Sequence, residues 1–242
     1  KLMNPKAITV TGKSITSTIG DGEIYDAEVI KSLDAPLQKE AGIAVLRGNI
    51  APLGAVIKPA AASPKLLKHS GPALVFESIE DFHARIDSDD LDVTADSVLV
   101  LRGCGPKGYP GMPEVSNMKI PGKLVAHGVT DMVRICDGRM SGTAYGTVIL
   151  HVAPESAAGG PLSKIKSGDI IELDVAARTI NVKLSDADLA ARSVSTTTEN
   201  AYADPARGWQ RMYIDHVMQA DTGADLDFLI GSSGSDVTRE SH

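Results

Sequence analysis

Short apolar runs rich in β-branched residues recur along most of the chain, and each of them predicts a β-strand. Several runs are apolar at every position, which is typical of strands that are covered on both faces. The two most C-terminal runs are joined by the short turn 176–178, so together they predict a hairpin. The runs span residues 7–11, 43–46, 55–57, 73–76, 97–101, 132–135, 147–152, 170–175 and 179–182.

Helix signals are fewer. Ser78 stands three positions before Asp81, and Ser185 stands three positions before Asp188, which is the spacing of a capped helix start. A third helix is predicted over 207–220, because its apolar residues recur every three or four positions. A stripe of this kind is typical of a helix that docks on a neighbouring surface. The stripe consists of Trp209, Met212, Tyr213, Val217 and Ala220.

The strands outnumber the helices and do not alternate with them, which predicts an α/β domain of mixed short strands, either a barrel or a sandwich-like fold. We expect this domain to cover residues 1–195. The polar run S-V-S-T-T-T at 193–198 is typical of a linker. Residues 196–242 are then a linker and a C-terminal helical tail, whose Ser/Gly-rich end at His242 is typical of a frayed terminus.

Composition excludes several classes of protein. The 242 residues are 43% hydrophobic and 23% charged, unlike a disordered chain. No run reaches the ~18–20 apolar residues of a membrane span, so we expect no membrane partner. The net charge of -7 argues against nucleic acid as a partner. No secretory signal opens the chain, which favours a cytoplasmic protein. The first residue is Lys1 rather than methionine, so we expect a fragment of a longer protein.

The most unusual segment is R-G-C-G-P-K-G-Y-P-G-M-P-E at 102–114, whose glycines and prolines exclude both a helix and a central strand. It predicts a loop with a fixed path after the strand 97–101, where α/β domains place their sites. Glu114 offers oxygen to a hard cation such as Mg²⁺, and the alternative is a solvated carboxylate. The glycines match a dinucleotide-binding pattern poorly, because Pro106 does not suit the start of a helix.

A second segment, C-D-G-R-M-S-G-T at 136–143, follows the strand 132–135. Ser141 and Thr143 present hydroxyls here, although each is also an ordinary turn residue. A serine acts as a base or nucleophile only beside a partner base or in a strongly electropositive site. No G-x-S-x-G motif is present, which argues against a hydrolase.

A third segment is the run L-R-G-N-I-A-P-L-G-A-V-I-K-P-A, in which Lys58 either meets an anionic ligand or extends along the surface. The only two cysteines, Cys104 and Cys136, form no C-x-x-C pair and exclude a protein built on disulfides. Two thiols alone complete neither a zinc site nor an iron–sulfur cluster, so both are expected to be small buried residues.

Taken together and in this order, "LRGNIAPLGAVIKPA", "GPKGYPGMPE" and "DGRMSGT" resemble the C-terminal half of the dihydroxy-acid and 6-phosphogluconate dehydratase family. The resemblance extends over about residues 8–192. The form "RGCGPKGYPG" and the tail "WQRMYIDHVMQADTGADLDFLIGSSG" resemble the sugar-acid branch, the pentonate dehydratases that act on acids such as L-arabinonate or D-xylonate.

The resemblance implies the loss of water from a 2,3-dihydroxy acid to give a 2-keto-3-deoxy acid, with Mg²⁺ and an iron–sulfur cluster as cofactors. We expect a [2Fe–2S] cluster, although the residues of this chain do not determine its type. Carried over by motif, Glu114 is a Mg²⁺ ligand, Ser141 is the base that removes the C2 proton, and Thr143 supports Ser141 by a hydrogen bond. A cationic centre nearby makes a serine base chemically reasonable, because positive charge lowers a hydroxyl pKa. Candidate substrate contacts are Lys58, Arg139 and Met140.

The resemblance also implies a fold, the swivelling β/α barrel, and a homo-oligomer, either a dimer or a tetramer. It places the cluster cysteines and the other Mg²⁺ ligands in an N-terminal domain that is absent from these 242 residues. Cys104 and Cys136 do not match the cluster positions. We therefore expect the chain alone to bind no cluster and to show no turnover. Two alternatives stay open: a dihydroxy-acid dehydratase of branched-chain amino-acid synthesis, and a non-catalytic ligand-binding domain of the same fold.

Overall fold

The computed structural model describes residues 4–39, 42–194 and 205–231. The chain divides into two compact units, residues 1–40 and 41–242. The predicted boundary at residue 195 stays a prediction. The predicted linker lies mostly outside the described residues, as does the terminus at His242.

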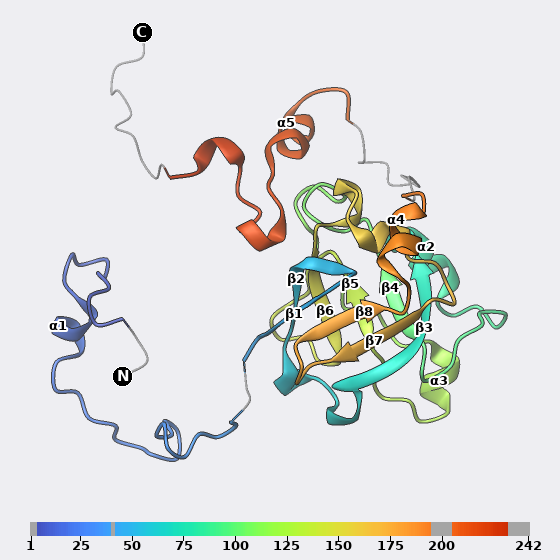
Figure 1. Ribbon diagram of the computed structural model, residues 1–242. Coiled ribbons are helices and arrows are strands. Elements are labelled where there is room, and N and C mark those ends of the chain that lie inside the picture. The colour runs from blue at the N-terminus through green and yellow to red at the C-terminus, as the bar shows by residue number, and fades with distance from the viewer. Residues whose placement is uncertain (1–3, 40–41, 195–204, 232–242) are drawn as a thin grey trace, which may run out of the picture. The chain divides into compact units, whose positions relative to one another are not determined.

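The larger unit contains a closed barrel of eight strands (Figure 1). Around the barrel the strands follow the order β1-β2-β6-β5-β4-β3-β7-β8. A mixed barrel with few helices fits the predicted α/β class, and eight of the nine predicted runs overlap these strands. The strands are β1 Ala44–Gly48, β2 Ala51–Ile57, β3 Lys68–Phe76, β4 Val98–Leu101, β5 Arg134–Cys136, β6 Val148–Ala153, β7 Ile170–Asp174 and β8 Thr179–Val182.

Strand direction divides the barrel into two parts. Neighbours within the series β3, β4, β5 and β6 are parallel. The β1/β2, β2/β6, β3/β7 and β7/β8 pairs are antiparallel, and the last of these is the predicted hairpin. Since parallel strands end at the same edge of a sheet, the loops that follow β3, β4, β5 and β6 all leave from one rim of the barrel.

The barrel is closed where β1 meets β8. Arg47 pairs with Thr179 in parallel register. Asn49 then extends the ladder through its side chain, which donates to the Val182 carbonyl at 2.9 Å and accepts from the Val182 N–H at 2.8 Å. A Cβ at Gly48 would lie 1.8 Å from the Ile180 carbonyl oxygen, so only glycine allows the strands to approach this closely.

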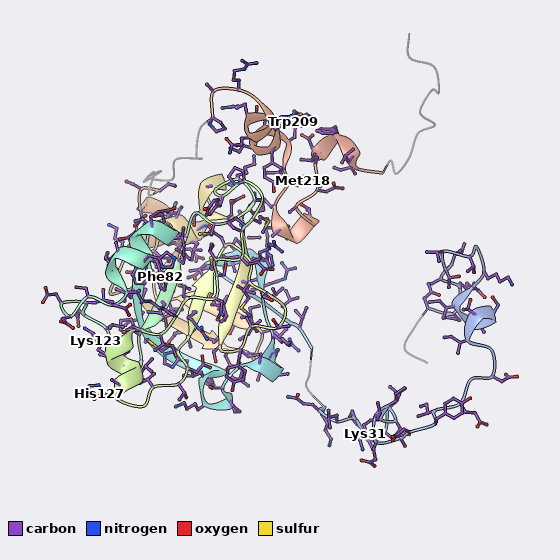
Figure 2. The ribbon with its side chains drawn as sticks, turned by 180° about the vertical axis from the view of Figure 1, so that it is seen from behind. Lys31, Phe82, Lys123, His127, Trp209 and Met218 are labelled. Carbon is purple, nitrogen blue, oxygen red and sulfur yellow. The ribbon has the colours of Figure 1, made fainter. Side chains whose placement is uncertain are left out.

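The apolar strand sequences follow from burial on both faces. Along β3, Ala73 and Val75 belong to the core cluster enclosed by the barrel, whereas Phe76 belongs to a second cluster outside it. Helix α2, Ile79–Arg85, covers that outer cluster, and Figure 2 labels its Phe82. The Phe76 and Phe82 rings meet edge to face with centroids 5.1 Å apart. Uniformly apolar strands are therefore what this architecture requires.

Two predicted helix caps are confirmed. The Ser78 hydroxyl accepts from the Asp81 N–H at 3.1 Å, and the Ser185 hydroxyl accepts from the Asp188 N–H at 3.0 Å. None of the described helices is long and apolar enough to cross a membrane. The remaining helices are α1 Ile15–Ile19, α3 Gly122–Ala126, α4 Asp186–Ala191 and α5 Trp209–His216, with short 3₁₀ turns at Pro59–Ala61, Pro64–Leu66, Ser156–Ala158, Pro161–Lys164, Ala220–Thr222 (η5) and Asp227–Leu229.

The helix predicted over 207–220 differs in length and in burial. It is the eight-residue α5, and none of its residues is buried. Trp209 is 82% exposed, so it does not serve as an apolar docking anchor. The helical tail as a whole stays a prediction, because 195–204 and 232–242 lie outside the described residues.

The smaller unit has no core of its own among its described residues, 4–39. The strand predicted at 7–11 is wrong: only an isolated bridge joins Ile8 to Ser14. No residue of this segment is buried. Figure 2 shows the side chains around Lys31 standing out from the ribbon. Its large apolar side chains that are half exposed or more are Ile8, Val10, Ile19, Ile24, Tyr25, Val29, Ile30, Leu33 and Leu37.

Candidate functional site

A charged side chain follows each of the four parallel strands at the common rim. Glu77 follows β3, Arg102 follows β4 and Asp137 follows β5, each at the first position after the strand, and Glu155 comes two positions after β6. Asp137, Arg102 and Glu155 are buried. None of these four residues was predicted as a site residue from the sequence motifs. The sequence does contain one indication of them, a charged residue directly after an apolar strand. A charge at such a position is shielded from solvent and therefore needs a hydrogen-bonding or oppositely charged partner.

Asp137 holds the start of the Gly/Pro loop. Its carboxylate is fully buried and accepts from the N–H groups of Gly103 at 3.1 Å, Cys104 at 2.8 Å and Ser156 at 2.9 Å. Three backbone donors on one buried carboxylate connect the loops after β4, β5 and β6. Asp137, the second residue of the segment 136–143, thus anchors the loops at the rim.

Glu155 holds the middle of the same loop. It is 1% exposed and accepts from the Lys107 N–H at 2.9 and 3.0 Å and from the Gly108 N–H at 2.9 Å. Burial raises the pKa of Glu155, and the nearby Asp137 charge raises it further. A Cβ at Gly105 would lie 2.5 Å from the Glu155 Oε2, so the loop needs glycine at this point.

Arg102 fixes where the loop leaves the barrel. Its guanidinium forms an ion pair with Glu77. Its Nη1 also donates to the backbone carbonyl oxygens of three residues, so the buried charge is fully engaged. The three carbonyls belong to Leu162 at 3.3 Å, Ser163 at 2.9 Å and Ile165 at 2.9 Å.

Glu114 and Arg139, predicted from different motifs, lie side by side. The Arg139 Nη1 is 3.4 Å from the Glu114 Oε1, and the two side chains are 46% and 47% exposed. Arg139 also donates through Nε to the Met112 carbonyl oxygen, and its own carbonyl accepts from the Ser116 N–H at 3.1 Å. A half-exposed carboxylate of this kind suits Mg²⁺ as one oxygen ligand, although a complete site requires further ligands.

Ser141 and Thr143 form the hydroxyl pair that the motif predicts. Their side-chain oxygens are 3.0 Å apart, and the Thr143 N–H lies 3.5 Å from the Ser141 Oγ. No carboxylate or imidazole among the described residues contacts Ser141, so a catalytic role depends on nearby positive charge. Lys58 supplies one such charge, because its Nζ donates to the Gly142 carbonyl at 3.1 Å. Met140, which lies between Arg139 and Ser141 in the sequence, is half-buried.

His151 contacts the segment 136–143, and it was not predicted as a site residue from the sequence. Its N–H donates to the Gly138 carbonyl at 3.0 Å, and its φ of 52° is rare for a residue other than glycine. Burial lowers the pKa of His151, and the Arg139 charge lowers it further, so the imidazole is neutral near pH 7. Its Nδ1 is buried and has no partner among the described residues.

The two cysteines lie together in the interior. The ligand atoms of Cys104, Cys136 and Asp137 are within 4.8 Å of one another, and all three residues are buried. A hydrogen bond to Cys136 and burial raise the pKa of Cys104 far above its usual range. The Asp137 oxygens already accept backbone N–H groups. Both cysteines are free and buried, as expected for small buried residues, and two thiols are fewer than the four ligands of an iron–sulfur cluster.

Comparison with known proteins identifies the family of this chain. Residues 28–224 match the family described as "Dihydroxy-acid/6-phosphogluconate dehydratase C-terminal". The chain is 54% identical to the L-arabonate dehydratase of Azospirillum brasilense over 100% of this chain and 42% of that protein. It is 48% identical to the L-arabinonate dehydratase of Rhizobium leguminosarum over 100% of this chain and 41% of that protein.

A more distant relative is a dihydroxy-acid dehydratase, the alternative enzyme that the sequence left open. The chain is 42% identical to the dihydroxy-acid dehydratase of Methanobrevibacter smithii, over 93% of this chain and 40% of that protein. The chain thus spans about two fifths of the length of the curated relatives that it matches. With the family match over most of its residues, the chain belongs to the dihydroxy-acid/6-phosphogluconate dehydratase family, within its C-terminal domain.

Proposed function

We propose that the chain is the C-terminal catalytic part of a sugar-acid dehydratase, which converts a pentonate such as L-arabinonate into a 2-keto-3-deoxy acid and water. The observation that carries this proposal is the pairing of Glu114 with Arg139 and of Ser141 with Thr143 on loops that follow adjacent strands. The identities of 54% and 48% to L-arabonate and L-arabinonate dehydratases support the substrate class.

In the proposed reaction the Ser141 Oγ, as the alkoxide, takes the proton from C2 of the acid. The C3 hydroxide leaves and takes up one proton, equivalent to the one that Ser141 removed from C2, so that one water is released and the resulting enol tautomerises to the ketone. Thr143 holds the Ser141 oxygen by a hydrogen bond. The positive charge of Lys58 beside Gly142 favours the alkoxide. Arg139 and Met140 contact the anionic substrate.

Glu114 is the residue of this chain that holds Mg²⁺ in the proposal, and the ion when bound supplies positive charge against the developing enolate. The iron–sulfur cluster has no fitting ligands among the described residues of this chain, so the proposal places all of its ligands in the family's N-terminal domain. A dihydroxy-acid dehydratase is the second candidate, because the relative from Methanobrevibacter smithii shares 42% identity. A non-catalytic ligand-binding domain is the third.

Turnover is tested in a chimera in which this chain replaces the region that it matches in the Azospirillum brasilense L-arabonate dehydratase. We expect the chimera to form a 2-keto-3-deoxy acid from L-arabinonate, and the 242-residue chain alone to form none. Iron and acid-labile sulfide are measured in both proteins and are expected only in the chimera. Preference for a branched-chain dihydroxy acid would favour the second candidate. A stoichiometric cluster in the isolated chain would refute the assignment of its ligands.

The proposed partner of residues 4–39 is the same N-terminal domain, which would cover their exposed apolar side chains. Val10, Tyr25 and Leu37 are 107%, 98% and 89% exposed, and a segment without buried residues cannot offset its own ordering entropy. We also propose that the protein forms a homo-oligomer, either a dimer or a tetramer, through other surfaces.

Limited trypsin digestion tests this partner. We expect cleavage after Lys13 and Lys39 to be at least ~10-fold slower in the chimera than in the isolated chain, since docking removes access to the backbone. Cleavage after Lys166, in an exposed turn of the barrel, serves as the internal control. Equal cleavage rates at Lys13 in the two proteins would show that the segment is not covered.

A further inference from the structure

Strand β6, which lies between β2 and β5 in the barrel, contains a bulge at His151 (Figure 1). Val56 of β2 pairs with Leu150 of β6. Two positions earlier on β2, Gly54 pairs with Ala153, which is three positions further along β6, so β6 has one residue more than its partner between these pairs. His151 has a φ of 52°, in the left-handed region. Bulges of this kind redirect a strand and are frequent beside functional sites.

The bulge bonds to residues 136–143, here called the serine motif. The His151 N–H donates to the Gly138 carbonyl oxygen at 3.0 Å. Gly138 lies beyond the last regular pair between β5 and β6, which joins Ile135 to Ile149. The hydrogen bond therefore extends the contact between the two strands into the loop that carries the candidate base.

Two other segments confine the same part of the serine motif. A Cβ at Gly138 would lie 2.8 Å from the Cys104 carbonyl oxygen, so the backbone passes here without room for a side chain. The Arg139 carbonyl oxygen accepts from the Ser116 N–H at 3.1 Å. The backbone at 138–139 is thus held by β6 on one side and by Cys104 and Ser116 on the other. Because Ser141 follows only two positions later, this backbone sets the path on which the Ser141 hydroxyl is presented.

The contribution of residue 151 to this arrangement comes from its backbone. The imidazole borders a cavity of about 550 Å³ that is also lined by residues of β1, β2 and η5. Its Nδ1 is buried and has no partner among the described residues, so no hydrogen bond of that atom accounts for the conformation. A residue with a Cβ adopts the left-handed region at a cost, and such strain is typically found at functional sites, where the surrounding structure enforces it.

We propose that the left-handed backbone at His151 positions the serine motif, and that His151 is a positioning residue for Ser141. It acts through its N–H on the Gly138 carbonyl rather than through its ring. The inference rests on the proposed function for the role of Ser141 as the base. The link between the bulge and the loop does not depend on that role, so the two can fail separately.

Four substitutions at His151 separate the backbone from the side chain. Glycine and asparagine adopt the left-handed region readily, alanine does so at a cost, and the β-branched valine is the least tolerant of it. All four variants lack the imidazole, so differences among them report on the backbone. His151→Ala makes a milder change in the same direction as His151→Val and replaces it if the valine variant does not fold.

The first test is amide hydrogen exchange in the 242-residue chain. The reporters are the residue-151 amide, which donates to Gly138, and the Ser116 amide, which donates to Arg139. After correction for intrinsic rates, we expect both to exchange about 5- to 30-fold faster in His151→Val than in His151→Gly, the factor that corresponds to the cost of a left-handed residue. His151→Asn should behave like His151→Gly, and His151→Ala should fall between.

The matched control is Arg178, which has a φ of 61° and is exposed in the turn between β7 and β8. Arg178→Val introduces the same backbone strain outside the serine motif and should leave exchange at Ser116 unchanged. Equal exchange at Ser116 in His151→Val and His151→Gly would overturn the inference. So would an equal acceleration at Ser116 in Arg178→Val, because exchange would then report a general loss of stability.

The second test is turnover of L-arabinonate by the chimera. We expect kcat to stay within about threefold in His151→Gly and His151→Asn and to fall at least ~10-fold in His151→Val, because a small displacement of a reacting group is costly. Arg178→Val should retain kcat. A loss in His151→Gly as large as in His151→Val would show that the imidazole is required and would overturn the inference. An unsubstituted chimera without turnover would contradict the proposed function, while exchange at Ser116 would still decide whether the bulge holds the motif.

Discussion

Replacing Ser141 with alanine in the chimera is expected to lower kcat by at least ~10²–10⁴-fold, the usual contribution of a general base. The side chain is only half-buried, and Thr143 is its one side-chain partner in the part of the chain that the structure describes. The free energy of unfolding should therefore change by less than about 1 kcal/mol. Turnover is measured with L-arabinonate, and stability is measured by urea denaturation of the same protein.

Two further variants sharpen this expectation. Thr143→Val removes one hydrogen bond to the proposed base and should cost roughly tenfold or less in kcat. Ser88→Ala, at an exposed position after α2, should leave kcat unchanged. Normal turnover in Ser141→Ala would exclude this serine as the base. Loss of bound metal in Ser141→Ala would mean that the decrease in kcat reports on the metal site instead.

Replacing Asp137 with alanine is expected to destabilise the fold by about 3–5 kcal/mol. The substitution leaves the N–H groups of Gly103, Cys104 and Ser156 buried without their acceptor, at ~1–3 kcal/mol for each group that does not find water. A typical domain is stable by ~5–15 kcal/mol, so the loss is a large part of the total. Urea denaturation of the 242-residue chain measures it.

The control for Asp137→Ala is Asp92→Ala, an exposed carboxylate with no hydrogen bond among the described residues, which should cost less than about 0.5 kcal/mol. Asp137→Asn keeps one acceptor oxygen and should fall between the two. Equal stability of Asp137→Ala and Asp92→Ala would show that the rim does not depend on this carboxylate. The loop after β4 would then need another anchor.

The local sequence pattern predicted most of the strands, because a strand that is buried on both faces must be apolar at every position. The run at 73–76 is apolar throughout since one side faces the barrel interior and the other faces α2. The helix caps at Ser78 and Ser185 were also predicted correctly, because the capping hydroxyl and the N–H group that it accepts from lie within four residues of each other in the chain. The strand predicted at 7–11 was wrong, because apolar periodicity does not reveal whether a neighbouring strand exists.

Motif resemblance predicted the candidate chemistry at Glu114, Ser141 and Thr143, and the structure adds their hydrogen bonds and ion pair. What the sequence did not reveal is what holds these residues. Asp137 and Glu155 are 18 positions apart in the sequence, yet both support one loop. Nothing local marks such a carboxylate as an anchor, because its partners are backbone amides of distant segments.

By itself, then, the sequence determined the strands, the helix caps, the loop motifs and the family, all of which depend on residues close together in the chain. The tertiary structure alone decided the closure at Asn49, the common rim of four parallel strands, and the hydrogen bonds between Gln219 and Glu155. These features depend on which strands are neighbours and in which direction they run. That choice follows from the burial of the whole domain, so no short segment encodes it.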